Sequence, residues 1–556
     1  MKIKNEIKNL FLQKKFLDII FLIETKFEKK PSEILNILAI SRLSHERNKE
    51  TYKQALTEFE EAYSRDKNSQ DGLNALINYI NATADLDDYM GHHDTSNFSK
   101  IFLEQSVKFF KEAEQKFGYN SKLISSGIRI FKRLNQLDII LIYYKKLYDQ
   151  NDLNLQTLTS WIFYNNYKTY WQQRDYNKFT KLLDEHIPNI SDDKLISFSS
   201  KKNDKIKIGF LSAHINKFHS ITFFFKTICA SYNKKDFELY LFLNNKIEDE
   251  AVENLKKKID GIFNISSLND VEAINFIRNK NIDIVFDIMG LTSSNRITLF
   301  KNRVSPIQIS WLGYCNTIGI KNMDYLIADP NLIYKNEINQ YSEKVLFLPN
   351  IWNCHSGFEL SRQEHTAPVL KNNYITFGSF NNFNKINSSV VKIWSNILKK
   401  IPNSKLIIKS PTKKDIEYLE NLFDINRVKE SVSFLSPEKE FINHLNLYNK
   451  IDIALDTFPW NGVTTSFESI WMGVPVLTLK GYNFNSRCGE SINKNINMEE
   501  LIAIDEDDYI KKAVNLATNK NYLTSIRKKI YNDAIISPLF NTDKFSREFF
   551  ILLKKL

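Results

Sequence analysis

The stretch IDIALDTFPWNGVTTSFESIWMGVPVLTL, from Ile451 to Leu479, decides the fold of this chain. It reads as a buried strand that ends at Asp456, a turn with Pro, Asn and Gly, and a helix that begins near Thr464, followed by the strand VPVLTL. Apolar strands that alternate with helices are typical of a doubly wound parallel sheet. Because ligands of such sheets bind beyond the carboxyl ends of the strands, we expect a site at this turn.

The same alternation extends on both sides of this stretch. It predicts a sheet domain over residues 372–556, with a helix from Ser388 to Lys400 and the strands YITFGSF, KLIIKS, SVSFL, IDIALD and VPVLTL. An earlier set predicts another sheet domain over residues 204–355, with strands in KIKIGFLSAH, FELYLFL and IDIVFD and at Ile307–Leu312, Tyr325–Ala328 and Lys344–Leu348. We therefore expect two Rossmann-like domains with a cleft between them, a pattern that several classes of two-domain α/β enzyme share.

Residues 1–200 carry a different pattern, in which apolar residues recur at spacings of three and four and Gly and Pro are scarce. The segment YKQALTEFEEAYSRDKNS places Tyr52, Ala55, Phe59 and Ala62 on one helix face. Similar helices are expected at Ile101–Phe117 and Leu137–Tyr148. We predict an all-α, tetratricopeptide-like array of about four helix pairs that offers a concave surface to a partner; an irregular helical domain is the alternative.

The composition is that of an ordinary globular protein, with 43% hydrophobic and 25% charged residues and a net charge of +11. The basic residues are spread along the chain without a cluster or an aromatic platform, so we expect no nucleic-acid partner. Four scattered cysteines and the absence of a long apolar run predict a soluble, cytoplasmic protein without a membrane span. The four are Cys229, Cys315, Cys354 and Cys488.

The helix predicted to begin near Thr464 has features of an anion site. Its first N–H groups and the positive end of its dipole suit a phosphate, and the hydroxyls of Thr464 and Thr465 add donors. Glu468, one turn later, is placed to accept from ribose hydroxyls. The pattern Thr465-x-x-Glu468 also matches a capping box, which needs no ligand. The local features therefore leave open whether these residues bind a nucleotide or cap the helix.

Taken whole, Ile451–Leu479 is similar to the nucleotide-sugar motif of the O-linked N-acetylglucosamine transferase family, which includes the SPINDLY-type enzymes. Further segments resemble that family in the same order: IDIVFDIMGLTSSNR, SPIQISWLGYCNTIGIKNMDYLIAD, YSEKVLFLP and GSFNNFNKINSSVVKIWSNILKKIPNSKLIIKS. The resemblance runs from about Lys205 to the end of the sequence. It implies a GT-B fold, two Rossmann-like domains facing a cleft, behind tetratricopeptide repeats.

The resemblance also assigns roles to particular residues. The family's diphosphate-contacting lysine falls on Lys385, where a cation can neutralise the departing diphosphate without a metal. His444 matches a histidine near the nucleotide, with a half-buried packing histidine as the alternative. The remaining donor-side positions are Asn382, Asn461, Gly462, Thr464, Thr465 and Glu468. The implied activity is an inverting, metal-independent transfer of a sugar, N-acetylglucosamine from UDP-GlcNAc, to protein Ser/Thr hydroxyls.

On the acceptor side, the family has a histidine in the loop after the first strand of the first sheet domain. Here that position falls on His219, which we predict to position the acceptor, with His214 as its competitor because the loop is one residue longer. A histidine can also serve as general base near neutral pH. The acceptor protein is expected to bind through the helical repeats.

Five residues depart from the family pattern: Leu291, Cys315, Asn316, Asn382 and Val463. Val463 removes a polar or stacking contact with the donor, so a GDP-fucose or UDP-glucose donor is an alternative. Further alternatives are a sugar transfer to asparagine, a non-protein acceptor, and a helical scaffold with an inactive transferase domain. The Asp-x-Asp patterns at Asp85–Asp87 and Asp505–Asp507 are expected to lie in solvated loops. With no histidine pairs at ligand spacing, we expect no metal and no cofactor beyond the nucleotide sugar.

Overall fold

The computed structural model describes residues 2–90, 98–168, 173–199, 203–217, 219–246, 249–358, 362, 364–409, 412–438 and 440–556. The chain forms two compact units. The first comprises residues 1–153 with 411–418, and the second comprises residues 154–410 and 419–556.

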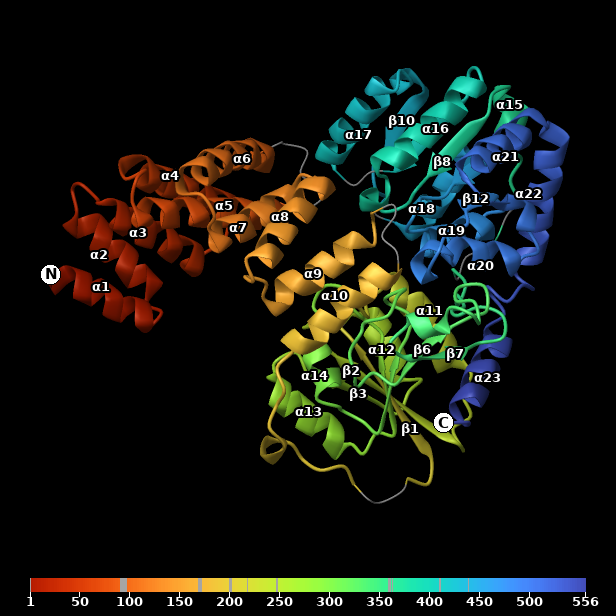
Figure 1. Cartoon of the computed structure of the whole chain (residues 1–556), viewed down its shortest axis with the longest axis horizontal. Helices are drawn as coiled ribbons and strands as arrows, with labels where there is room; N and C mark the ends of the chain where they lie inside the picture. The colour runs from red at the N-terminus through yellow and green to blue at the C-terminus, as the bar shows by residue number, and fades with distance from the viewer. Residues whose placement is uncertain are drawn as a thin grey trace. The chain divides into compact units, whose positions relative to one another are not determined.

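The first unit is a succession of helices, each packed against the next (red to orange in Figure 1). They are α1 (Lys2–Leu12), α2 (Phe16–Lys26), α3 (Ser32–His45), α4 (Lys49–Arg65), α5 (Gln70–Met90), α6 (Phe98–Phe117), α7 (Ser121–Arg133) and α8 (Leu137–Asp149). The predicted face of α4 is confirmed, because Tyr52, Ala55, Phe59 and Ala62 are all buried. Asn48 and Asn120 start α4 and α7 by accepting hydrogen bonds from backbone N–H groups, as N-cap asparagines do.

Helices α9 (Leu155–Asn165) and α10 (Gln173–His186) belong to the second unit. They are attached to the first sheet domain by buried polar contacts. Asn166 Nδ2 donates to the Tyr314 hydroxyl over 2.9 Å, and the Tyr176 hydroxyl donates to the carbonyl of Thr317 over 2.9 Å. The boundary between the two units therefore falls between α8 and α9, inside the helical region.

The first sheet is parallel throughout, in the order β3-β2-β1-β4-β5-β6-β7. Its strands are β1 (Ile206–Ser212), β2 (Phe237–Leu243), β3 (Gly261–Asn264), β4 (Ile284–Asp287), β5 (Ile307–Ser310), β6 (Tyr325–Ala328) and β7 (Lys344–Phe347). Its helices are α11 (Ser220–Ala230), α12 (Glu250–Lys256), α13 (Asp270–Asn279) and α14 (Ile297–Lys301). The strand order reverses between β1 and β4, which is where such sheets bind ligands.

The second sheet is also parallel, in the order β10-β9-β8-β11-β12-β13, and reverses between β8 and β11. Its strands are β8 (Thr376–Ser379), β9 (Lys405–Lys409), β10 (Val432–Leu435), β11 (Ile453–Leu455), β12 (Val476–Leu479) and β13 (Ile502–Ala503). Its helices are α15 (Val369–Asn372), α16 (Ser388–Lys400), α17 (Lys413–Ile425), α18 (Phe441–Asn446), α19 (Thr464–Trp471), α20 (Cys488–Lys494), α21 (Glu506–Thr518) and α22 (Lys520–Ala534). Two sheets of this kind behind a helical region confirm the predicted fold class.

The last helix, α23 (Thr542–Leu553), follows the second sheet domain in sequence but packs on the first (Figure 1). The Phe549 ring lies 4.8 Å from that of Trp311 and 5.5 Å from that of Phe286, both in the first sheet domain. This crossing joins the two sheet domains at a second place along the chain.

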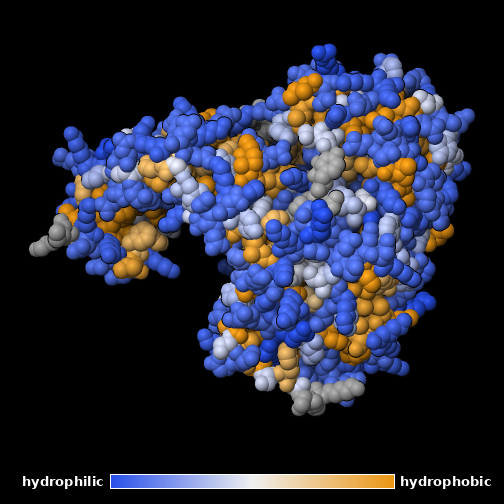
Figure 2. All heavy atoms as spheres, viewed as in Figure 1, coloured by the Kyte–Doolittle hydropathy of each residue, from blue (hydrophilic) through white to orange (hydrophobic). Residues whose placement is uncertain are grey.

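On the face drawn in Figure 2, hydrophilic residues predominate and hydrophobic residues occur in separate patches. None of the helices in the described ranges is both long and apolar enough to cross a membrane. The four cysteines are free and buried.

Candidate active site

The turn after β11 is held by one buried carboxylate. Asp456 Oδ1 accepts from the backbone N–H groups of Gly462 (2.7 Å) and Thr457 (2.9 Å), and its Oδ2 accepts from the Thr478 hydroxyl (2.7 Å). Burial raises the pKa of Asp456 to about 6. Gly462 is required by the close packing here, since a Cβ would lie 2.6 Å from Asn381 Oδ1. The turn is thus fixed at the carboxyl edge of the second sheet.

Helix α19 begins directly after this turn without a side-chain cap. Its N-cap is Val463, and the hydroxyl of Thr465 donates to Asn381 Oδ1 over 2.8 Å instead of capping the helix. The capping-box interpretation of Thr465 and Glu468 is therefore wrong. The uncapped first turn, which starts at Thr464, leaves backbone N–H donors and the positive end of the helix dipole for an anion.

Lys385 lies on the other side of the reversal point, in the loop after β8. Its Nζ donates to the carbonyl of Asn461 over 2.7 Å and lies 5.4 Å from the Trp460 ring. Burial lowers the pKa of the Lys385 ammonium, and the Asp456 carboxylate opposes that effect. Asn461 in turn accepts from Gly489 N and donates to the Thr457 carbonyl, which fixes the position of Lys385.

His444 and Glu468 meet in a second part of the site. His444 Nε2 lies 2.9 Å from Glu468 Oε2, which also accepts from the Tyr448 hydroxyl over 2.8 Å. All three side chains are buried. The His444 ring lies against the rings of Phe441 and Phe380. A carboxylate anchored through one oxygen in this way can present the other to a hydroxyl.

The structure does not bring Asn382 into this cluster. Asn382 is exposed, and its side chain accepts from Asn384 N at the start of a short 3-10 turn. Its neighbour Asn381 is buried and bonded to Thr465. Sequence reasoning missed Asn381, as it missed Lys409 and Tyr448. Asn381 and Lys409 are polar residues at or just after the carboxyl ends of β8 and β9, a position that could have identified them.

On the first sheet domain, His219 caps α11. Its Nδ1 accepts from Ile221 N over 3.3 Å, so a neutral ring carries its proton on Nε2. The ring stacks on His214 at 4.7 Å, and His214 Nε2 lies 3.2 Å from the Thr292 hydroxyl. Burial, and secondarily His214, lowers the pKa of His219 to about 4. His219 is thus arranged to donate a hydrogen bond, which suits holding a hydroxyl oxygen.

Helix α11 also connects the two sheet domains. Its Phe224 ring lies 5.1 Å from Phe467 of α19, and its Phe223 ring lies 5.5 Å from Phe441 of α18. His219, at the start of α11, is therefore carried by the helix that packs on the elements bearing His444 and Glu468.

A second contact between the sheet domains is made by Arg487, just before α20. Its guanidinium forms a two-point ion pair with Glu337 and lies 4.0 Å from the Tyr334 ring. The Tyr334 hydroxyl donates to Glu490 of α20 over 2.9 Å. Glu337 and Tyr334 both follow β6, so these contacts hold the first sheet domain against the second.

Asp287, at the carboxyl end of β4, is a buried acid that the sequence reasoning did not select. Its Oδ1 accepts from Met289 N and Gly290 N, whereas within the described residues its buried Oδ2 has no partner. Burial raises the pKa of Asp287 from 3.8 to about 6. The folded state therefore binds this proton more tightly than the unfolded state does, and ionising Asp287 above about pH 6 costs stability.

We expect Asp287→Asn to raise the free energy of unfolding at about pH 8 by roughly 2–3 kcal/mol, since each pKa unit is worth about 1.4 kcal/mol. The gain should shrink as pH falls through about 6 and vanish near pH 4, where the acid is protonated in both states. Urea-unfolding midpoints across this range measure it. Asp505→Asn, at an exposed N-cap, is the control; a gain for Asp287→Asn that does not vary with pH would contradict the prediction.

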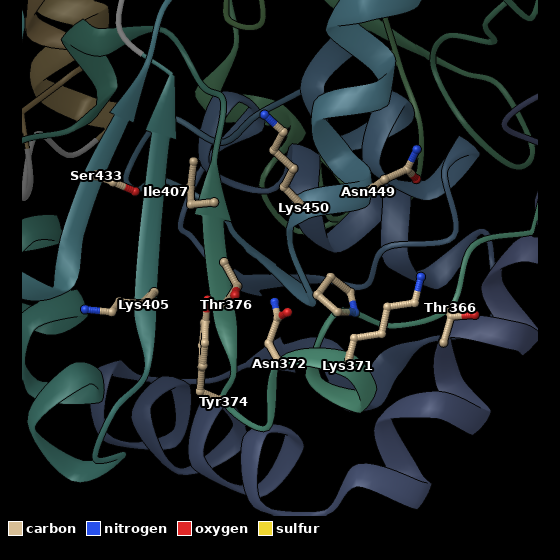
Figure 3. A pocket seen from close by; sticks show the side chains of 11 residues that line it. Thr366, Lys371, Asn372, Tyr374, Thr376, Lys405, Ile407, Ser433, Asn449 and Lys450 are labelled. Carbon is tan, nitrogen blue, oxygen red and sulfur yellow. The ribbon is translucent and has the colours of Figure 1, made fainter.

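A hollow of about 370 Å³ lies at the opposite, amino-terminal edge of the second sheet (Figure 3). Thr376 and Lys405, the first residues of β8 and β9, line it together with Lys371 and Lys450. The amines of the three lysines point in different directions and do not converge on one point. Ligands of parallel sheets bind at the carboxyl edge, so the candidate active site is the one around Lys385.

No three His, Cys, Asp or Glu side chains gather as metal ligands in the ranges that the structure describes. In the comparison with protein families, the model of glycosyl transferase family 41 matches residues 177–356 and 355–549. These ranges contain both sheet domains and every candidate site residue.

Curated relatives include the protein named "Probable UDP-N-acetylglucosamine–peptide N-acetylglucosaminyltransferase SPINDLY". The sequence from Solanum lycopersicum is 31% identical over 59% of this chain and 36% of its own length. That from Hordeum vulgare is 28% identical over 68% of this chain and 40% of its own length. The chain thus spans well under half the length of these relatives.

Among solved structures, a mutant O-GlcNAc transferase of Thermobaculum terrenum is similar in fold. It has a TM-score of 0.78 and 19% sequence identity, over 94% of this chain and 97% of the other. This likeness supports the fold, including the helical region in front of the two sheet domains.

Proposed function

Because the chain belongs to glycosyl transferase family 41, we propose that it transfers a sugar from a nucleotide-diphosphate donor to protein hydroxyls. The preferred donor is UDP-GlcNAc and the preferred acceptors are serine and threonine side chains. The reaction would be an inverting displacement without a metal. The acceptor oxygen bonds to the anomeric carbon and its proton passes to the departing diphosphate, while the bond from that carbon to the diphosphate breaks.

The observation that carries the proposal is the pairing of Lys385 with the uncapped start of α19. The ammonium donates to the carbonyl of Asn461, two residues before the N-cap Val463, at the point where the second sheet reverses. A cation and a helix N-terminus together stabilise the charge that develops on a departing diphosphate. Thr464 and Thr465 would add hydroxyl donors, and Glu468 would accept from the ribose.

The acceptor would enter beside His219, whose neutral ring offers an Nε2–H to a hydroxyl oxygen. Holding donor and acceptor in line removes much of the entropic part of the barrier. We further propose that the helices α1–α8 guide an acceptor protein and that the protein works in the cytoplasm.

The donor is tested by thermal unfolding of the full chain with a panel of uridine- and guanosine-diphosphate sugars, with and without a chelator. A donor at a hundredfold its dissociation constant should add about 2.7 kcal/mol to the free energy of unfolding. Stabilisation by UDP-GlcNAc that the chelator does not change supports the proposal. Stronger stabilisation by GDP-fucose or UDP-glucose would show that the donor is that sugar nucleotide instead. If no compound stabilises the chain, a helical scaffold with an inactive transferase domain is favoured. The loss of a donor contact at Val463 is consistent with that outcome.

A further inference from the structure

A chain of hydrogen bonds extends from Lys409 to the ribose-side carboxylate of the candidate active site. Lys409, the last residue of β9, places its Nζ 3.0 Å from Nδ1 of His444. His444 Nε2 lies 2.9 Å from Glu468 Oε2, and the Tyr448 hydroxyl donates to the same oxygen. The cluster is contributed by four elements: β9, α18, the short turn Leu447–Lys450, and α19.

The directions of these hydrogen bonds can be worked out. An ionised carboxylate only accepts, so His444 Nε2 must carry a hydrogen and donate it to Glu468. Between Nζ and Nδ1 a single proton is then shared. The Lys409 ammonium can only donate, so Nδ1 of His444 is the acceptor in this contact and the ring carries its hydrogen on Nε2.

The charges of the cluster balance in this arrangement. The Lys409 ammonium and the Glu468 carboxylate have opposite charges and are connected through a neutral imidazole. Within the described residues, half-buried Lys409 and buried Glu468 are the charged side chains that contact His444, and the titratable Tyr448 lies beside it. Burial lowers the pKa of Lys409, and Glu468 opposes that effect. Balanced, fully hydrogen-bonded clusters are the form in which buried charges are tolerated.

The free oxygen of Glu468 is what this cluster offers to a ligand. Oε2 receives both donors, whereas among the described residues none donates to Oε1. We propose that Lys409 is a positioning residue of the donor site. By donating to Nδ1, its ammonium orients the His444 ring so that the Nε2–H points at Glu468 and holds that carboxylate ready to accept from the donor's ribose. This inference rests on the proposed function for its ligand, but the tautomer itself does not depend on it.

The tautomer is tested by NMR of the full chain labelled with ¹⁵N-histidine, with the His444 ring assigned through His444→Gln. The wild type is expected to show a neutral ring with its proton on Nε2. In Lys409→Met the Nδ1 atom loses its donor, so the ¹⁵N signal of the His444 ring is expected to move away from its wild-type position. Lys409→Arg, which keeps a cationic donor, should retain the wild-type signal.

Lys405→Met is the matched control, because Lys405 lies on the same strand at its exposed amino end (Figure 3). Its Nζ donates to the carbonyl of Glu430, outside the cluster. The control should show the wild-type His444 signal. A wild-type ring protonated on Nδ1 would overturn the proposal, and this outcome does not depend on how well the variant folds. An unchanged His444 signal in Lys409→Met would also overturn it.

The consequence for binding is tested with uridine diphosphate and guanosine diphosphate by titration calorimetry. For whichever diphosphate the wild type binds, Lys409→Met should bind about tenfold more weakly than the wild type, and Lys405→Met should bind as the wild type does. Wild-type affinity in Lys409→Met would overturn the positioning role. Failure of the wild type to bind either diphosphate would contradict the proposed function instead, and the histidine spectrum would still decide the tautomer.

Discussion

Replacing Lys385 with alanine is expected to lower turnover by roughly 10²–10³, the effect of removing one preorganised donor from a developing negative charge. The ammonium is partly desolvated and held by the Asn461 carbonyl, so it needs no rearrangement when the diphosphate departs. Turnover is measured as release of nucleoside diphosphate from the donor that the thermal panel selects, with a peptide library as acceptor.

Lys371→Ala is the control for this variant. Lys371 is an exposed lysine at the amino edge of the same sheet domain, so its loss should leave turnover unchanged. Circular dichroism of both variants checks that the fold is kept. Wild-type-like turnover in Lys385→Ala would show that this lysine does not face the diphosphate, and the helix N-terminus would remain as the only argued anion site.

Arg487→Met is expected to lower the free energy of unfolding by about 3–5 kcal/mol, the usual cost of removing one partner from a buried ion pair. The Arg487 side chain is 5% exposed and that of Glu337 is 20% exposed, so the carboxylate left behind is poorly solvated. The measurement is the urea-unfolding midpoint followed by tryptophan fluorescence, because Trp352 packs near Phe484 in the same region.

Two further variants define the origin of that loss. Adding Glu337→Gln to Arg487→Met removes the stranded charge and should recover part of the stability. Lys145→Met breaks an ion pair whose side chains are 66% and 47% exposed and should cost less than about 1 kcal/mol. A loss as small as that of Lys145→Met would mean that the contact between Arg487 and Glu337 contributes little to holding the two sheet domains together.

The elements with strong apolar runs could be predicted from the sequence. The predicted helix Ser388–Lys400 coincides with α16, and the strand IDIVFD contains β4. Strand β3 was not predicted because Gly261–Asn264 lies at the sheet edge and is partly exposed, which weakens its apolar pattern. Strand β13 was not predicted because it is only two residues long. The assignment of α9 and α10 to the second unit depends on buried contacts such as that between Asn166 and Tyr314, which no local pattern reveals.

The candidate site could be predicted in part. Spacing located the turn and the start of α19, and the family resemblance selected Lys385, His444 and Glu468. Whether Thr465 caps the helix or contacts Asn381 depends on the neighbouring strand, so sequence alone left it open. The same holds for Lys409, since its contact with His444 joins residues 35 positions apart.

The path of α23 has a consequence for biosynthesis. The first sheet domain has all its strands once Phe347 has been made, yet the helix that covers Trp311 and Phe286 follows roughly two hundred residues later. At a translation rate of about 5–20 residues per second, α23 is synthesised roughly 10–40 s after the first sheet domain, and the two aromatic rings remain uncovered during that time. During that interval the nascent chain presents an apolar face, and chaperones that bind such faces are expected to associate with it before release.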